Sequence, residues 1–402
     1  MAGAAKGQEM HFGANEPGDD VDWDDPLYVA DPRRAYDQLR DRCPLVRRRD
    51  GSWLVTGHEE VRRCALAPEA LSNHVSSRLQ IPNGLDGDEH RRFRALVDRF
   101  FDAGRVLALS PRFRALAEAL SSGLGRGTPV DAVSDIGAPL AVRFQCEWLG
   151  WPSSLEPVLL AWMADYRAAQ RGSDPSLRAR AAERFDSLVA EQLRIRQGTE
   201  ASDVTSELLH STVEDPAVPA GRRALTQAEA ISILRNWTAG DLGTIAACAG
   251  VVLHRVAGDA ELQRWLRARL SDEGSLDEAI DECLRLDDPF LWNRRVAATA
   301  FELGDGVIPA GARVFLNWTS ANRDPRGFAA AHEFRPKENA PHNLVYGIGP
   351  HVCPGRGLAT AQLRVTLAAL LENTSKLRLA EREPERASAP TGGFDHVWLI
   401  LE

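Results

Sequence analysis

The sequence predicts a mainly α-helical fold with a minor β region, built as a single large helical domain. Apolar residues recur at spacings of three and four through most of the middle of the chain, which is the period of a helix packed on one face. Alternation typical of strands is concentrated late, in "RVAATAFELGDGVIPAGARVFLNW". No repeat, low-complexity tract or linker divides residues 23–402, and 402 residues with 44% hydrophobic content suffice for a large core.

Taken in order, the elements begin after an acidic, polar lead over residues 1–22, which we expect to be disordered. The pattern predicts a helix in "DPRRAYDQLRDRC", a short strand in "SWLVTG" and a second helix in "HEEVRRCALA". Breaks such as "RGTP", "GWPSS" and "EDPAVPAG" then separate further helices. Those helices are predicted over 90–101, 111–125, 135–150, 153–171, 175–197, 226–257 and 259–270.

Charge and hydropathy exclude some classes of function. The formal net charge is −9, so no bulk positive field attracts nucleic acid. No run of about 18 apolar residues could span a membrane, and the start of the chain lacks the basic and apolar stretches of a signal peptide. We therefore expect a soluble, cytoplasmic monomer with no nucleic-acid or membrane partner.

Six cysteines are scattered without a C-x-x-C pair, which argues against a disulfide framework or a zinc module. Five of them have contexts typical of small buried hydrophobic residues, namely Cys43, Cys64, Cys146, Cys248 and Cys283.

Cys353 differs, because it lies in the glycine-rich segment "YGIGPHVCPG" directly before the amphipathic stretch "RGLATAQLRVTLAALLENT". A helix N-terminus stabilises negative charge and should favour the thiolate. The residues alone leave three interpretations open: a metal ligand, a nucleophile with His351 as its base, or a buried cysteine in a turn.

The segment "YGIGPHVCPG" resembles the haem-binding loop of the cytochrome P450 family, Phe-Gly-x-Gly-x-His-x-Cys-x-Gly, with Tyr346 in place of phenylalanine. "DECLR" resembles the family's Glu-x-x-Arg, "SANRDPRGF" its segment before the meander, and "DGDEHRRFR" its haem-contacting helix. Their order and spacing agree across residues 25–402. The resemblance implies a P450 fold around a buried haem b (iron protoporphyrin IX).

The same resemblance assigns roles around the cofactor. Cys353 becomes the axial ligand of the iron, and Pro354 after it has no N–H to donate to the sulfur, so we expect an electron-rich thiolate. Gly347, Gly349 and Gly355 allow the loop to fold tightly against the haem.

The haem propionates need cationic partners. His90 and Arg94 lie four residues apart on one helical face and can reach one propionate together. The resemblance adds His351 and Arg295, although Arg294 competes because the segment before it looks one residue short.

Glu282 and Arg285 are predicted to pair in a buried structural network behind the haem. The family completes this network with a third side chain, for which His332 and Arg335 are the candidates.

The segment "RNWTAGDLGTIAACAG" is expected to be the long helix over the haem. One helical face collects Asn236, Gly240, Gly243, Thr244 and Ala247. The family pattern Ala-Gly-x-Asp/Glu-Thr, whose acid and threonine deliver protons to dioxygen, puts Leu242 and Gly243 at those two positions, so the usual relay is absent. Asp241 and Thr244 are each one residue away. Either they take part in catalysis, or Asp241 lies on a flank and Thr244 bonds a carbonyl one turn back.

The first hypothesis for function is a bacterial-type monooxygenase of secondary metabolism that uses O2 and electrons from a separate ferredoxin and ferredoxin reductase. The second is an atypical peroxygenase or aryl-coupling enzyme without the relay, and the third is a non-catalytic haem protein that binds a ligand. A small aromatic or mixed aromatic and polar substrate is expected to contact the loop 72–88 and residues on two other segments, namely Asn236, Trp237, Gly240 and Leu291.

Overall fold

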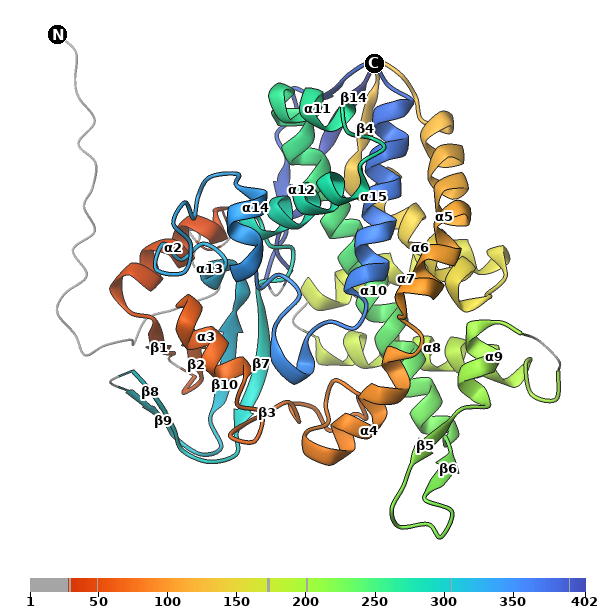
Figure 1. Ribbon diagram of the computed structural model, residues 1–402, viewed down its shortest axis with the longest axis vertical. Helices are drawn as coiled ribbons and strands as arrows, with labels where there is room; N and C mark the ends of the chain where they lie inside the picture. The colour runs from red at the N-terminus through yellow and green to blue at the C-terminus, as the bar shows by residue number, and fades with distance from the viewer. Residues whose placement is uncertain are drawn as a thin grey trace.

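The computed structural model describes residues 28, 30–48, 50–171, 174–199, 202–304, 306–389 and 391–402. The lead over residues 1–22, predicted to be disordered, lies outside this described part. No described helix is both long and apolar enough to cross a bilayer. Figure 1 shows a β-rich part that contains α2, α3 and the sheet of β7 and β10, beside a larger part built from the long helices.

The larger part confirms the helices predicted from the apolar spacing. Its elements are α4 (Gly87–Asp98), α5 (Ala103–Gly123), the π-helix η1 (Ala132–Gly137), α6 (Ala138–Leu149), the 3-10 turn η2 (Ser153–Leu155), α7 (Glu156–Arg171), α8 (Pro175–Arg194), α9 (Val204–Leu209), α10 (Gln227–Gly258), α11 (Ala260–Arg267), α12 (Glu273–Leu286) and α15 (Arg356–Glu372).

Helix α5 begins well before the predicted start at residue 111. Asp102 caps it, because its Oδ1 atom accepts the N–H of Gly104 at 2.9 Å. Pro111 therefore lies inside the helix instead of opening it.

The β-rich part holds a five-stranded sheet in the order β1-β2-β10-β7-β3, in which β2 and β10 are parallel and the other neighbours antiparallel. Its strands are β1 (Leu45–Arg47), β2 (Trp53–Val55), β3 (Leu71–Ser72), β7 (Trp292–Ala297) and β10 (Arg313–Asn317). Helices α2 (Pro32–Arg42), α3 (His58–Ala65) and α13 (Trp318–Ala321) accompany it. The predicted strand in "SWLVTG" and the late sheet are thus confirmed.

Smaller elements complete the fold. A second sheet has the order β11-β14-β4, formed by β11 (Leu377–Leu379), β14 (Trp398–Leu401) and β4 (Pro129–Asp131). Three antiparallel pairs are β5 (Thr212–Glu214) with β6 (Arg222–Ala224), β8 (Phe301–Leu303) with β9 (Gly306–Ile308), and β12 (Glu385–Arg386) with β13 (Phe394–His396). Short helical turns are α14 (Pro336–Asn339), η3 (Ala340–His342) and η4 (Gly349–His351).

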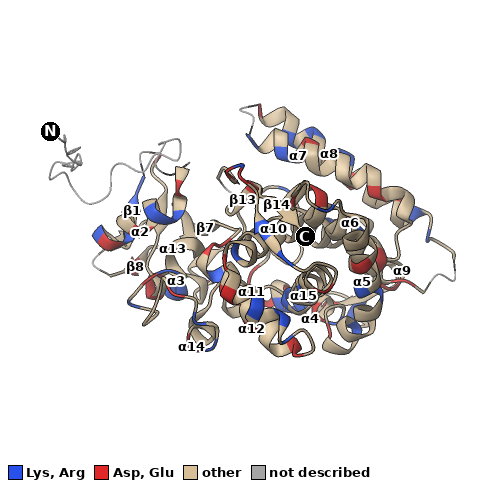
Figure 2. Ribbon diagram, turned by 90° about the horizontal axis from the view of Figure 1, so that it is seen from above, with Lys and Arg blue, Asp and Glu red and all other residues tan. Residues whose placement is uncertain are grey.

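Helix α10 is the central element of the larger part. A capping box starts it, in which Thr226 and Glu229 satisfy each other's backbone N–H groups. It packs against η1, α6, α8, α12 and α15, and most of its residues between Ile245 and Val256 are buried. Figure 2 shows α7 and α8 lying side by side along one edge of the molecule, and α8 contacts α10. The same view shows positively and negatively charged residues interspersed along the elements.

Candidate active site

Cys353 lies in the loop between η4 and α15, and its main chain is fixed on both sides. Its N–H donates to the carbonyl of Tyr346 at 2.9 Å, and the N–H of Val352 donates to Gly349 at 3.0 Å. Gly347 and Gly349 have φ angles of 72° and 77°, so the predicted need for glycine is confirmed at both. At Gly355 the φ angle is an ordinary −82°, and the nearest contact of a Cβ atom, 3.4 Å from Phe101, is of ordinary length, so neither conformation nor space requires glycine there.

The Cys353 side chain is the one exposed cysteine of the six, and all six are free. Desolvation by the surrounding protein nevertheless raises the pKa of its thiol, while the N–H groups of Gly355 and Arg356 lower that pKa by a smaller amount. The N–H groups at the start of α15 thus act in the expected direction, but desolvation outweighs them, so the helix N-terminus alone does not favour the thiolate. A thiol that is accessible yet surrounded by protein lies in a recess, where a bound cation would be needed to hold the thiolate.

Of the other cysteines, Cys64, Cys146, Cys248 and Cys283 are buried as predicted. Cys43 is only half-buried, and its thiol donates to the carbonyl of Leu45 at 2.9 Å beside the start of β1.

Two glycines open a gap in α10. Gly240 and Gly243 are exposed although the helix around them is largely buried, and a Cβ atom at either would meet no atom within 4 Å. Asp241 of this helix raises the pKa of the Cys353 thiol, so the two segments lie near each other. The predicted gap is thus present, and it lies near the cysteine.

The residues beside the gap do not rebuild the usual proton relay. Leu242 is fully buried and Gly243 has no side chain. Burial raises the pKa of Asp241 to about 7, and the amide of Gln362 on α15 donates to its Oδ2 atom at a long 3.5 Å. Asp241 therefore lies on the flank that faces α15. In the described part of the chain, the Thr244 hydroxyl makes no hydrogen bond to the carbonyl one turn back, so the expected flank position holds for Asp241 but the expected bond of Thr244 is absent.

A cluster of buried nitrogen donors lies beside the cysteine loop. The rings of His90 and His351 are 4.0 Å apart between centroids, and neither Nε2 atom has a hydrogen-bond partner, although that of His351 lies 3.5 Å from Asp86 Oδ1. Desolvation lowers the pKa of both histidines, that of His351 to about 4. Arg295 is 6% exposed, and desolvation lowers its pKa to about 10.

Arg295 forms no ion pair with any carboxylate of the described residues, and its guanidinium donates only to the carbonyl of Arg294 at 2.8 Å. Arg294 itself is exposed on the opposite face of β7, which favours Arg295 over Arg294 as a buried partner for an anion. Unpaired buried donors that converge in this way fit an anionic ligand.

Arg94 has a different environment from the one predicted. Its guanidinium donates to the carbonyls of Pro350 and Val352 at 3.1 and 2.6 Å and to Asp98 at 2.6 Å. It therefore holds the cysteine loop against α4, on the helix that carries His90.

Comparisons with known proteins agree with this geometry. The family model for cytochrome P450 matches residues 274–392. A putative cytochrome P450 126 from Mycobacterium tuberculosis is 31% identical over 327 residues, which cover 80% of this chain and 77% of that protein. This chain belongs to the cytochrome P450 family.

Cyclomarin C epoxidase CymV from Salinispora arenicola is 30% identical, over 88% of this P450 and 92% of the epoxidase. The crystal structure of cytochrome P450 CYP101C1 superposes with a TM-score of 0.85 at 25% identity and covers 98% of this chain and 99% of the other. The P450 fold is confirmed, and the protein is an oxidoreductase of the P450 monooxygenase type with haem as its cofactor.

The residues present fit that cofactor. The accessible sulfur of Cys353 can ligate iron, and the gap at Gly240 and Gly243 leaves space beside it. The unpartnered Nε2 atoms of His90 and His351 and the guanidinium of Arg295, which has no carboxylate partner among the described residues, can donate to two carboxylates.

The Glu282–Arg285 pair of this P450 is formed as predicted. Arg285 Nε and Nη2 donate to the Glu282 carboxylate at 2.7 and 2.8 Å, and both side chains are buried. The third side chain is Asn339, whose amide donates to Glu282 at 2.7 Å. Both candidates were wrong: Arg335 contributes only its backbone N–H, at 2.8 Å, and His332 accepts from Arg323 instead.

Of the expected substrate contacts, Trp237 and Leu291 are buried in core clusters. Trp237 packs against Phe100, Phe101 and Trp148, and Leu291 is 2% exposed. Neither offers surface to a substrate, because the sequence does not show which side of an element faces the core. Gly240 is exposed and faces open space, and Asn236 is partly exposed.

The loop 72–88 is attached to α10. Asn236 donates to the carbonyl of Ile81 at 2.8 Å, and the Ser232 hydroxyl accepts the N–H of Ile81 at 2.9 Å. Asp186 on α8 accepts from Arg78 of the loop at 2.6 Å and from Arg235 of α10 at 2.9 Å. Asn236 therefore positions the loop, which the sequence could not show because the partner is a distant carbonyl.

Proposed function

We propose that this P450 inserts one oxygen atom from O2 into a small natural-product molecule and receives its electrons from a separate ferredoxin and ferredoxin reductase. The observation that supports it best is the accessible Cys353 near the glycine gap of α10. The curated relative named as an epoxidase of cyclomarin C supports a natural product as the substrate class.

The bound haem, with a thiolate ligand, supplies the activation of O2. We take it to be haem b, because the sequence contains no C-x-x-C-H motif for covalent attachment. In the proposal Cys353 ligates the iron, His90, His351 and Arg295 hold the propionates, and Arg94 holds the loop through the carbonyls of Pro350 and Val352.

The electron donor is proposed to dock where the cysteine loop reaches the surface. The side chains of Arg91 and Arg356 are 71% and 57% exposed, and both belong to the helices that flank the loop. Such arginines suit an acidic partner, which predicts that association weakens as the salt concentration rises.

The first test concerns the ligand. The reduced carbon monoxide adduct of the protein should show the red-shifted Soret band of thiolate ligation, and Cys353→Ser should abolish it. Cys43→Ser, on a half-buried cysteine far from the loop in sequence, serves as the control and should keep the band. A red-shifted band in Cys353→Ser would mean that another residue is the ligand.

A second candidate function has a specific observation behind it, namely the missing relay. Because Leu242 is buried and Gly243 lacks a side chain, the enzyme could instead use peroxide, couple aromatic rings, or take a proton from its substrate. Turnover with hydrogen peroxide, compared with turnover through ferredoxin and its reductase, separates the two functions.

The second test restores a hydroxyl. Restoring both the acid at Leu242 and the threonine at Gly243 is unsuitable, since Leu242→Glu would bury a carboxylate without a partner. Gly243→Thr has room, because a Cβ atom there meets no neighbour within 4 Å, and Gly243→Val is its control of equal size without the hydroxyl. If the relay is lost, Gly243→Thr should raise the product formed per reduced nicotinamide consumed, whereas Gly243→Val should not and Thr244→Ala should change little. Strong uncoupling in Thr244→Ala would show that Thr244 already acts as the relay.

A panel of aromatic and macrocyclic compounds, screened by ligand-induced shifts of the haem spectrum, identifies the substrate class. Variants of the loop 72–88 should change the dissociation constants of the compounds that shift the spectrum, and unchanged constants would remove this loop from the substrate site.

A further inference from the structure

Tyr346 occupies the position where the family's loop pattern has phenylalanine, and its main chain touches the proposed iron ligand. Its carbonyl accepts the N–H of Cys353 at 2.9 Å. The next residue, Gly347, has a φ angle of 72°, and its N–H donates to Leu344 at 2.8 Å. The orientation of the Tyr346 carbonyl is therefore fixed within a tight turn, and any movement of the tyrosine is passed to the cysteine.

The side chain of Tyr346 is held by polar groups from two other segments. Its hydroxyl lies 3.2 Å from the Thr360 hydroxyl of α15. The guanidinium of Arg356 lies 5.1 Å from the centre of its ring and donates to Asp281 of α12 at 2.7 Å. The ring thus lies at the junction of the cysteine loop, α12 and α15.

Asp281 is the second polar neighbour of the tyrosine hydroxyl. Its Oδ1 atom is buried and accepts no hydrogen bond within normal distance from the described residues. Desolvation raises the pKa of this carboxyl, while Arg356 and the nearby hydroxyl of Tyr346 lower it. A phenylalanine here would leave Thr360 and Asp281 without that hydroxyl, so the surroundings of the loop match a tyrosine.

We propose that Tyr346 is a positioning residue whose hydroxyl, held by the Thr360 hydroxyl of α15, fixes the carbonyl that orients Cys353 toward the iron. The inference rests on the proposed role of Cys353 as the haem ligand. It assigns to the one departure from the family's loop pattern the task of keeping the thiolate in place.

The experiment follows thiolate ligation directly. In the haem-loaded protein, the decay of the red-shifted Soret band of the reduced carbon monoxide adduct is measured for Tyr346→Phe, Thr360→Val and the double variant. Tyr166→Phe is the control, since Tyr166 lies on α7 and stacks on Trp162. Tyr346→Phe should lose the band roughly three to ten times faster, the size expected for one buried hydrogen bond. Thr360→Val should do so by a smaller factor.

Because the two hydroxyls act as one contact, the double variant should decay no faster than Tyr346→Phe. The unfolding midpoint of each variant is measured as well. A positioning role speeds the decay of the band without a matching fall in the midpoint, whereas a fall in proportion to the faster decay would show a merely structural role. Wild-type decay in Tyr346→Phe, or effects that multiply in the double variant, would overturn the inference. Absence of the red-shifted band in the wild type would instead overturn the proposed role of Cys353.

Discussion

At the scale of single residues, burial without a partner distinguishes the groups that bind a ligand from those that stabilise the fold. Arg285 is as buried as any residue of the chain, yet its guanidinium donates to Glu282 and to three backbone carbonyls. Arg295 is also buried but has one carbonyl only. Since an uncompensated buried charge is costly, the second environment is explained by an anion that the protein binds.

Arg295 offers a prediction with a built-in control, because Arg294 next to it points to the other face of β7 and is exposed. Arg295→Gln should release haem to a haem-free globin acceptor about 10 to 100 times faster, the equivalent of one charged hydrogen bond. Arg294→Gln should release it at the wild-type rate. Equal rates in the two variants would mean that Arg295 does not bind a propionate.

At the scale of elements, the site is held by ties between segments that are distant in sequence. The Glu282 carboxylate of α12 accepts from Arg285, one turn later in the same helix, and from Asn339 of α14. Arg285 also donates to the carbonyls of Asn322 and Ala331. These contacts fix the segment 322–339 behind the cysteine loop. The side chain of Asn343 in the following turn also donates to the carbonyl of Asp281, which strengthens the same connection.

Two variants separate the parts of this network. Glu282→Ala strands the buried Arg285 charge and should lower the free energy of unfolding by about 3–5 kcal/mol, with little haem bound. Asn339→Ala removes one neutral donor and should cost about 1–3 kcal/mol with haem retained. Chemical denaturation and haem content measure both. A Glu282→Ala protein with normal stability and haem content would show that the pair does not support the site.

The features that could be predicted from the sequence are those that leave a pattern among neighbouring residues. The periodicity of α10 and α15 and the need for glycine at Gly347 and Gly349 are local signals, and each was confirmed. Asn339 and the attachment of Asn236 to Ile81 depend on contacts between distant segments, which leave no local pattern. Trp237 was misplaced because α10 is apolar on several sides, so its hydrophobic pattern does not say which side faces the core.

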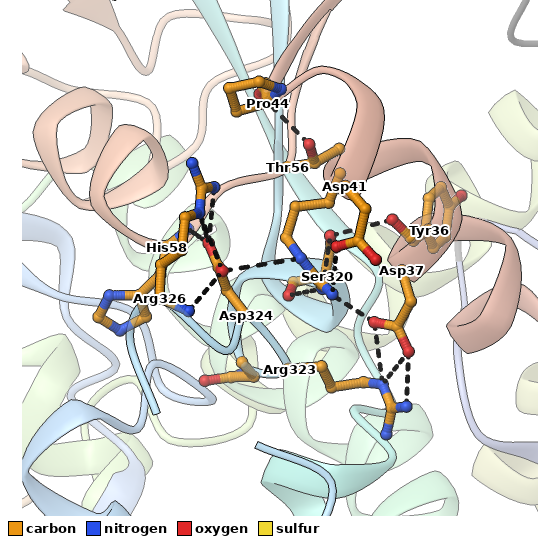
Figure 3. Close-up of polar contacts among 12 residues, drawn as sticks. Tyr36, Asp37, Asp41, Pro44, Thr56, His58, Ser320, Arg323, Asp324 and Arg326 are labelled. Atoms are coloured by element: carbon orange, nitrogen blue, oxygen red, sulfur yellow. Dashed lines mark hydrogen bonds and ion pairs between the residues drawn. The ribbon is translucent and has the colours of Figure 1, made fainter. Parts of the chain in front are cut away.

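At the scale of the whole molecule, a buried polar network connects α2, α3 and the segment after α13 within the β-rich part. Figure 3 shows Asp324 among side chains from α2, α3 and the segment after α13. Asp324 is 1% exposed and accepts the N–H of His58 at 2.8 Å and the guanidinium of Arg326 at 2.7 Å. Arg40 of α2 lies 3.8 Å from it and donates to the carbonyl of Ser320 at 2.9 Å.

This network predicts how the stability of the fold depends on pH. Desolvation raises the pKa of Asp324, but the hydrogen bonds from Arg326 and from the N–H of His58 outweigh it and leave the pKa below its usual value. A carboxyl with a lowered pKa in the folded state stabilises the fold above its unfolded pKa, near 3.9, and this contribution disappears as the pH falls through the folded value. Asp324→Asn should therefore be less stable than the wild type at pH 7, and the difference should shrink steadily below about pH 4.

Asp50→Asn is the matched control for Asp324→Asn. The pKa of Asp50 is also lowered, through hydrogen bonds from Ser52 that outweigh desolvation, but its side chain is 58% exposed. Its loss should change the free energy of unfolding by much less, because water replaces the lost partner. Chemical denaturation at a series of pH values measures both variants. If the deficit of Asp324→Asn stayed constant from pH 7 to pH 3, the cause would be lost packing, and the charge of Asp324 would not be what ties α2 and α3 to the segment after α13.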